Sequence, residues 1–229
     1  MSLILSLETS TNVCSVALTR EGDTVATEKL FVEKSHSNLL TVVIDSLLGQ
    51  VGIEKQELSA IAVSKGPGSY TGLRIGVSTA KGLCYALDKP LIAVNTLQAM
   101  AREILPYNTH QAYLCPMLDA RRMEVYTALY DASLKELMPT QAMILDESSF
   151  AETLAENNVL FFGNGSDKFR ALVESNANAY FISGHSPSAL AVGQLASEAY
   201  QKQRFEDVAY FEPFYLKDFV ATKPKKKLL

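Results

Sequence analysis

The chain has 229 residues, 48% hydrophobic and 20% charged, a composition typical of a globular protein. This length is enough to bury a core, as one domain or as two small lobes. The formal net charge of −4 argues against a protein that binds nucleic acid without a partner, because phosphate contacts need clustered lysine and arginine.

The first half of the chain predicts a strand meander followed by alternating helices and strands. Three antiparallel strands joined by polar turns are expected at residues 3–7, 13–18 and 24–31. A helix is expected at 37–50, where Leu39 and Val42 widen the apolar stripe beyond what one sheet would need. The elements expected next are a buried strand at 60–63, a helix at 73–87, a strand at 91–94 and a helix at 96–104.

The second half continues the alternation, which favours an α/β sheet with helical layers. Residues 105–108 mark a boundary between an N-terminal lobe, 1–105, and a C-terminal lobe, 106–229. A final helix is expected at 186–201, with Ser186 as its N-cap and Pro187 at its first position, packing back on the N-terminal lobe. The other elements expected here are strands at 112–118, 124–130 and 159–162 and a helix at 148–156.

The segment SKGPGSYTGLRIG, residues 64–76, is the most informative motif of the chain. Gly66-Pro67-Gly68 predicts a tight turn between a buried strand and a helix, and Ser69 or Thr71 is placed to cap that helix. Free backbone N–H groups at such a turn can hold an anion, which points to a phosphate site. The motif is not a P-loop, and a glycine turn used only for packing fits the same residues.

Glu8-Thr9-Ser10 forms a second polar turn, between two paired strands. An acid with two hydroxyls can face a nucleotide phosphate or its metal, whereas the same residues also suit a plain hairpin turn. Further along, Asp119 with Arg121 and Arg122 suggests a local ion pair at a turn.

Several site classes are not supported by the sequence. The three histidines and three cysteines are too widely spaced for a metal site or a disulfide framework. No apolar run reaches the roughly 20 residues that span a bilayer, so we expect a cytoplasmic protein without a membrane partner. The one basic cluster, at 223–227, is typical of a solvated terminus, and the alternative is a weak contact with RNA held by a partner.

These motifs together resemble one family, the bacterial TsaB (YeaZ) proteins, over nearly the whole chain. The matching segments, in family order, are LSLETS with CSVAL, the glycine motif, LIAVNTL, LDARRMEVY and, near the end, EPFYL. The resemblance implies an actin-like (ASKHA, ribonuclease H-like) fold of two lobes. It also implies a role in making threonylcarbamoyladenosine, the modified adenosine next to the anticodon of many tRNAs.

In that family the protein pairs with a larger paralogue, TsaD, which carries the metal and the transfer chemistry, and TsaE joins them. The resemblance therefore implies a non-catalytic subunit without a cofactor, which forms a homodimer when alone and meets tRNA only through the complex. In TsaD-like chains a helix carries two metal-binding histidines where this sequence has Thr96 and Met100. A hydroxyl and a thioether cannot replace two imidazoles for a divalent ion.

Two other functions fit parts of the sequence. One is an ATP-binding acyl-kinase-like or sugar-kinase-like enzyme on the same fold, with phosphates at Glu8 to Ser10 and Gly66 to Gly68. However, Glu8 stands where many actin-like nucleotide sites have aspartate, and the extra methylene would move the carboxylate. The other is a metallopeptidase, which the lack of paired histidines disfavours.

A partner surface is expected on two helices. Gly72, Gly76, Ala80 and Leu83 fall on one face of the helix after the glycine turn. Glycine inside a helix costs roughly 1 kcal/mol relative to alanine, so the two glycines need a reason. A close approach by a partner helix, or packing against this chain's own sheet, would supply it. With Leu39, Val42 and Val43 of the preceding helix, this face corresponds to the surface that the family uses for dimerisation.

Overall fold

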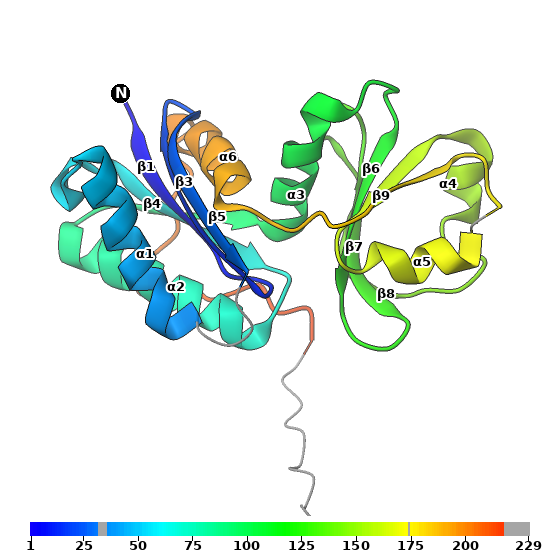
Figure 1. Cartoon of the computed structure of the whole chain (residues 1–229), viewed down its shortest axis with the longest axis horizontal. Coiled ribbons are helices and arrows are strands. Elements are labelled where there is room, and N and C mark those ends of the chain that lie inside the picture. Colours follow the sequence, from blue (N-terminus) through cyan, green and yellow to red (C-terminus); the bar gives the residue numbers. More distant parts are fainter. Residues whose placement is uncertain (32–35, 174, 218–229) are drawn as a thin grey trace, which may run out of the picture.

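Apolar residues alternating along two sets of strands form two separate sheets in the computed structural model, which describes residues 1–31, 36–173 and 175–217. The first sheet has the order β3-β2-β1-β4-β5 and the second the order β10-β9-β6-β7-β8. Figure 1 shows the two sheets in two lobes side by side. The basic cluster at 223–227 lies outside the described residues.

The first sheet contains the predicted meander. Its strands are β1 (Leu3–Glu8), β2 (Val13–Arg20), β3 (Asp23–Phe31), β4 (Ala60–Gly66) and β5 (Leu91–Asn95). β1, β2 and β3 are antiparallel, whereas β4 is parallel to both β1 and β5. The helices of this lobe are α1 (His36–Val51), α2 (Tyr70–Leu87) and α6 (Ala189–Gln201), with a 3₁₀ turn at Lys55–Glu57.

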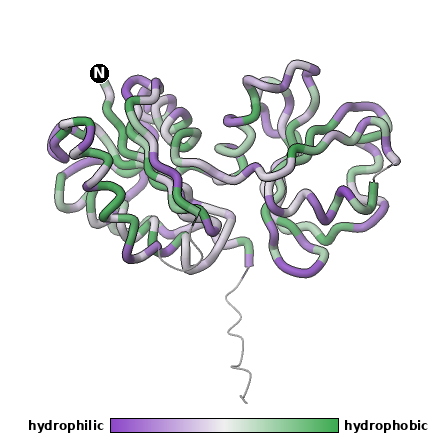
Figure 2. The backbone as a smooth tube through the Cα atoms, in the orientation of Figure 1, coloured by the Kyte–Doolittle hydropathy of each residue, from purple (hydrophilic) through white to green (hydrophobic). Residues whose placement is uncertain are grey.

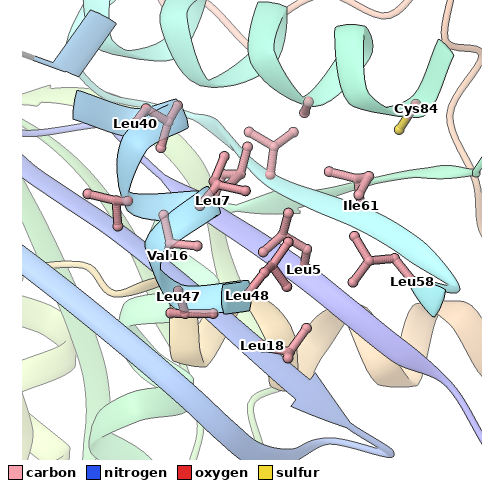
Figure 3. Packing of buried hydrophobic residues seen from close by; sticks show 14 of the residues in the cluster. Leu5, Leu7, Val16, Leu18, Leu40, Leu47, Leu48, Leu58, Ile61 and Cys84 are labelled. Carbon is pink, nitrogen blue, oxygen red and sulfur yellow. The ribbon is translucent and has the colours of Figure 1, made fainter. Parts of the chain in front are cut away.

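Both faces of the first sheet are buried, because β1 points successive side chains to opposite sides. Leu5 and Leu7 face α1 and α2, where they pack with the apolar residues that Figure 3 labels, among them Leu40 and Ile61. Ile4 faces the other way and packs against α6. The final helix thus returns to the first sheet.

The second sheet has an aromatic core. Its strands are β6 (Tyr113–Asp119), β7 (Glu124–Tyr130), β8 (Glu136–Ile144), β9 (Val159–Phe162) and β10 (Ala179–Ile182). The short helices α4 (Ala151–Glu156) and α5 (Ser166–Val173) cover one face, where Phe161 lies 4.9 Å from Phe169 and 5.3 Å from Phe181 between ring centroids. Each lobe has an apolar cluster of its own, and Figure 2 shows hydrophobic stretches running through both.

Helix α3 (Thr96–Ile104) lies between the lobes. Its Ala99 belongs to the apolar cluster of α6 and the first sheet, whereas Leu97 packs with Leu114 of the second sheet. A 3₁₀ turn, Leu105–Tyr107, then leads into β6. Figure 1 shows a second connection, from β10 back to α6. The division into lobes 1–105 and 106–229 remains our proposal, although α6, from the second range, packs on the first sheet.

Several predicted boundaries are wrong. The final helix begins at Ala189, so Ser186 and Pro187 lie before it, and Ser188 donates a hydrogen bond to Glu103 (2.9 Å) instead of capping the helix. Helix α4 begins at Ala151, because the Asp146 carboxylate accepts from Ser148 N (2.9 Å) and holds the preceding residues in a turn. Helix α2 begins three residues before the predicted start. The structure also contains β8, α5 and β10, which were not predicted.

In the part of the chain that the structure describes, no helix combines the length and the apolar character that crossing a membrane requires.

We predict that Phe161→Ala destabilises the protein by about 3–5 kcal/mol, because it leaves a cavity among the three aromatic rings that pack on Phe161. Tyr180→Ala, on the adjacent strand but 46% exposed, should change the free energy of unfolding by less than about 1 kcal/mol. Urea denaturation followed by circular dichroism measures both. Equal effects of the two substitutions would contradict the assignment of the core.

Candidate functional site

A cavity of about 960 Å³ lies between the two lobes. The first lobe contributes the β1–β2 turn, the glycine turn and the first turn of α2. The second lobe contributes the β6–β7 turn and Asn164, and the end of the described chain forms a further wall. The residues that line the cavity include Ser10, Pro67, Gly68, Ser69, Tyr70, Gly72, Asp119, Arg121, Tyr126, Asn164, Phe214, Tyr215 and Lys217.

The backbone of the glycine turn is bound by the chain itself. Ser69 N donates to the carbonyl of Ser10 (2.6 Å), and Ser69 Oγ accepts from Gly72 N (3.3 Å), which confirms Ser69 as the N-cap of α2. Two N–H groups expected to face an anion therefore have protein acceptors.

The glycines of this segment permit close backbone contact. A Cβ on Gly68 would lie 2.5 Å from the carbonyl oxygen of Ser10, and one on Gly72 would overlap the carbonyl oxygen of Thr9. Gly76 faces the Thr9 hydroxyl in the same way, and Thr9 Oγ1 donates to the carbonyl of Gly72 (2.8 Å). Because glycine has no side chain, the glycine turn and α2 approach Thr9 and Ser10 closely.

This packing corrects part of the predicted partner surface. Gly72, Gly76 and Ala80 are buried against the first sheet, and Val43 of α1 is buried with them, so none of the four is presented to a partner. The stripe of small residues is internal. Leu39 and Leu83 are half-buried.

The outer surface of α1 and α2 is nevertheless apolar in places. Val42 is 60% exposed and Tyr85 is 87% exposed. Two helical glycines, Gly49 and Gly82, have no atom within 4 Å of a Cβ position. The exposed sides of α1 and α2 therefore combine apolar side chains with glycines.

The predicted phosphate-facing residues separate into two groups. Ser10, Pro67 and Gly68 line the cavity, whereas Glu8, Thr9 and Gly66 do not. Gly66 instead packs against the carbonyl oxygen of Phe214, which would lie 2.7 Å from a Cβ there.

Glu8 is fully buried, and its Oε1 accepts from Ser10 N (2.6 Å). Burial raises the pKa of Glu8, although the hydrogen bond from Ser10 N acts in the opposite direction. Because burial disfavours the charged form and the carboxyl group is off the cavity surface, Glu8 is poorly placed to hold a metal ion there.

On the opposite wall, Asp119 organises the β6–β7 turn. Its carboxylate accepts from Lys168 Nζ (2.8 Å) and from the backbone N–H of Arg121 (2.6 Å). Burial acts to raise the pKa of Asp119, but the hydrogen bonds from Lys168 and Arg121 outweigh it and leave this pKa lowered. The expected ion pair with Arg121 and Arg122 is wrong in its partner: Lys168, on α5, supplies the charge.

Thr96 and Met100 are both buried on α3. Met100 packs with Leu97, Leu118 and Phe162 between α3 and the second sheet. Asn95 caps the helix by accepting from Leu97 N (2.9 Å) and Gln98 N (3.2 Å). Within the described ranges, no three His, Cys, Asp or Glu side chains lie together as a metal would require.

Sequence reasoning missed three residues of this cavity. Lys217 pairs with Glu124, Tyr215 packs on Tyr70 at 4.8 Å between centroids, and Asn164 Oδ1 accepts from Asp119 N (2.9 Å). The EPFYL motif that contains Tyr215 was the available signal.

The family model described as tRNA N6-adenosine threonylcarbamoyltransferase, TsaD, matches residues 30–225. A protein of Haemophilus influenzae named tRNA threonylcarbamoyladenosine biosynthesis protein TsaB is 30% identical over 230 residues, which cover 96% of this chain and 95% of the relative. The Bacillus subtilis protein of the same name is 36% identical over 176 residues, or 75% of each chain.

Solved structures share the fold. YeaZ from Pseudomonas aeruginosa matches with a TM-score of 0.81 and 26% identity, over 94% of this chain and 100% of that chain. An activator of 2-hydroxyisocaproyl-CoA dehydratase from Clostridium difficile, solved with bound ADPNP, matches with a TM-score of 0.53 at 11% identity, over 88% and 97%. The second likeness shows the fold alone. The predicted two-lobed, actin-like α/β fold is confirmed.

We predict that Gly76→Leu destabilises the protein by about 1–3 kcal/mol, because the new side chain would clash with Thr9 and Val63. Gly82→Leu places the same side chain on the same helix in open space, and should leave stability unchanged or raise it by up to about 1 kcal/mol. The midpoints of urea unfolding compare the two variants. A Gly76→Leu protein as stable as the Gly82→Leu protein would mean that the glycine face is not internal.

Proposed function

The chain belongs to the TsaB family of tRNA threonylcarbamoyladenosine biosynthesis proteins, and on that premise we propose that it acts as the non-catalytic partner subunit of TsaD. The observation that carries this proposal is the likeness to a TsaB relative over 96% of the chain, combined with the side chains at positions 96 and 100. A role in this tRNA modification follows from the family.

The chemistry of α3 favours an accessory role. Thr96 and Met100 stand where the resemblance places two metal-binding histidines in TsaD, and both side chains are buried between α3 and its neighbours. A thioether in an apolar cluster is a poor ligand for a hard or borderline divalent ion. The transfer step would therefore take place on TsaD.

The geometry of the first lobe disfavours the kinase-like alternative. Glu8 is buried away from the cavity, and the amides of Ser69 and Gly72 already have protein acceptors. A phosphate would have to displace these contacts. The metallopeptidase alternative lacks paired histidines in the sequence.

The proposed partner surface is the outer side of α1 and α2, with Leu39, Val42 and Leu83 at its centre. Exposed apolar residues beside helical glycines allow another helix to approach closely. A paralogue with the same fold could use this surface pseudo-symmetrically, and a second copy of the chain could occupy it when TsaD is absent. We further propose that TsaE joins the pair in the cytoplasm and that tRNA is met only through the complex.

The proposed function predicts a strict requirement for the partner. A mixture of this protein with TsaD, TsaE, the donor-forming enzyme, tRNA, threonine, bicarbonate and ATP should form threonylcarbamoyladenosine. Omitting either this chain or TsaD should abolish the product, as nucleoside analysis by mass spectrometry would show. Product formed by this chain without TsaD would contradict a non-catalytic role.

The proposed surface predicts a specific loss of affinity. Val42→Arg should weaken TsaD binding at least about tenfold, because an unpaired guanidinium would be buried in an apolar contact. Val25→Arg, the same substitution at an exposed position on β3, is the matched control and should leave the Kd unchanged. Isothermal titration calorimetry measures both. Wild-type affinity in the Val42→Arg protein would place the partner elsewhere.

A further inference from the structure

The chain does not end at α6 but continues as an irregular segment, residues 206–217, which we call the strap. Glu206 N donates to the carbonyl of Leu91 (2.9 Å) and so pairs with the edge strand β5. In Figure 1 the reddish end of the chain runs past the first lobe and emerges on the side that faces the second lobe.

The root of the strap is fixed to the first lobe. Lys81 Nζ, on α2, donates to the carbonyls of Ala209 (3.1 Å) and Phe211 (3.0 Å). Phe214 N donates to the carbonyl of Lys65 at the end of β4 (2.7 Å). These backbone contacts, with Phe211 packed on the main apolar cluster, make the root part of the first lobe.

Aromatic contacts lead from the root to the cavity. The ring of Tyr215 packs on Tyr70 at the start of α2, and Tyr215 OH accepts from Arg74 Nε (3.3 Å). The guanidinium of Arg74 lies 4.4 Å from the centroid of Tyr70. The strap therefore enters the cavity wall in a fixed orientation.

The far end of the strap contacts the second lobe through charge. Lys217 forms an ion pair with Glu124 at the start of β7, and its Nζ lies 5.9 Å from the ring centroid of Tyr126. The ion-pairing side chains are 40% and 22% exposed, so water and salt reach them. A polar, partly exposed contact separates far more easily than the apolar and backbone contacts at the root.

We propose that the strap is an interlobe latch: fixed to α2 and β4 at its root, it holds the second lobe through Lys217 and Glu124 and thereby sets how far the cavity opens. The chain passes between the lobes at α3 and again between β10 and α6, so the strap adds a non-covalent link to these two covalent ones. The latch requires no partner and is independent of the proposed function.

The size of the effect follows from the chemistry of the contact. Exposed ion pairs shift an equilibrium by roughly 1.4- to 5-fold, so breaking this pair should enrich the open arrangement by about that factor without unfolding either lobe. Salt should act in the same direction on the unmodified protein, because it screens the pair.

Double electron–electron resonance between spin labels on the two lobes tests the latch. Thr24→Cys on β3 and Glu152→Cys on α4 place the labels on exposed positions, and the native cysteines are all buried. The variants to compare in this labelled protein are Lys217→Ala, Glu124→Gln and the charge exchange Lys217→Glu with Glu124→Lys. Lys202→Ala, an exposed lysine outside the cavity, is the matched control.

We expect each single variant to enrich the longer interlobe distances 1.4- to 5-fold, the charge exchange to restore the parent distribution, and the control to leave it unchanged. Raising the salt from about 0.05 M to about 1 M should enrich the same distances in the parent and have little effect on Lys217→Ala. The latch would be overturned by a parent distance distribution that is insensitive to salt. It would also be overturned if the single variants had the same distance distribution as the parent. The salt measurement stands even if a variant fails to fold.

Discussion

The β1–β2 turn lies directly against the start of α2, because the glycines there have no side chain, and the arrangement of the first lobe depends on this contact. Ser69 N binds the carbonyl of Ser10, and Thr9 Oγ1 binds the carbonyl of Gly72. Any Cβ at Gly68, Gly72 or Gly76 would push the helix away from the sheet. The same contact occupies the amide of Ser69, so close packing and phosphate binding compete for that N–H group.

Local patterns were sufficient where an element buries one clear face. The strands 124–130 and 159–162 and the helix 96–104 have the bounds that their patterns predict. Strand β8 escaped prediction because Pro139 interrupts its sequence, and the sheet tolerates this proline because β8 is an edge strand. Strand β10 is also an edge strand, and none of its four residues is fully buried, so its sequence marks no clear core face.

The candidate site was harder to predict, because its decisive contacts join residues far apart in the chain. The spacing of Gly72, Gly76 and Ala80 correctly indicated close packing, but the same spacing suits a partner and the chain's own sheet. Only the position of Thr9, more than sixty residues earlier, decides between them. Asp119 likewise finds its charge partner in Lys168 on another element, and no local pattern encodes that pairing.

The return of α6 to the first sheet has a consequence for synthesis on the ribosome. The face of that sheet formed by Ile4, Ala62 and Ile92 meets Ala99 of α3 but lacks its main cover until residues 189–201 have been translated. Ribosomes translate about 5–20 residues per second, so the chain from the end of β5 to the end of α6 takes roughly 5 to 20 s to make. In that time the whole second sheet is made, so the lobe that starts the chain is the last to be completed, and its apolar face is meanwhile open to chaperones.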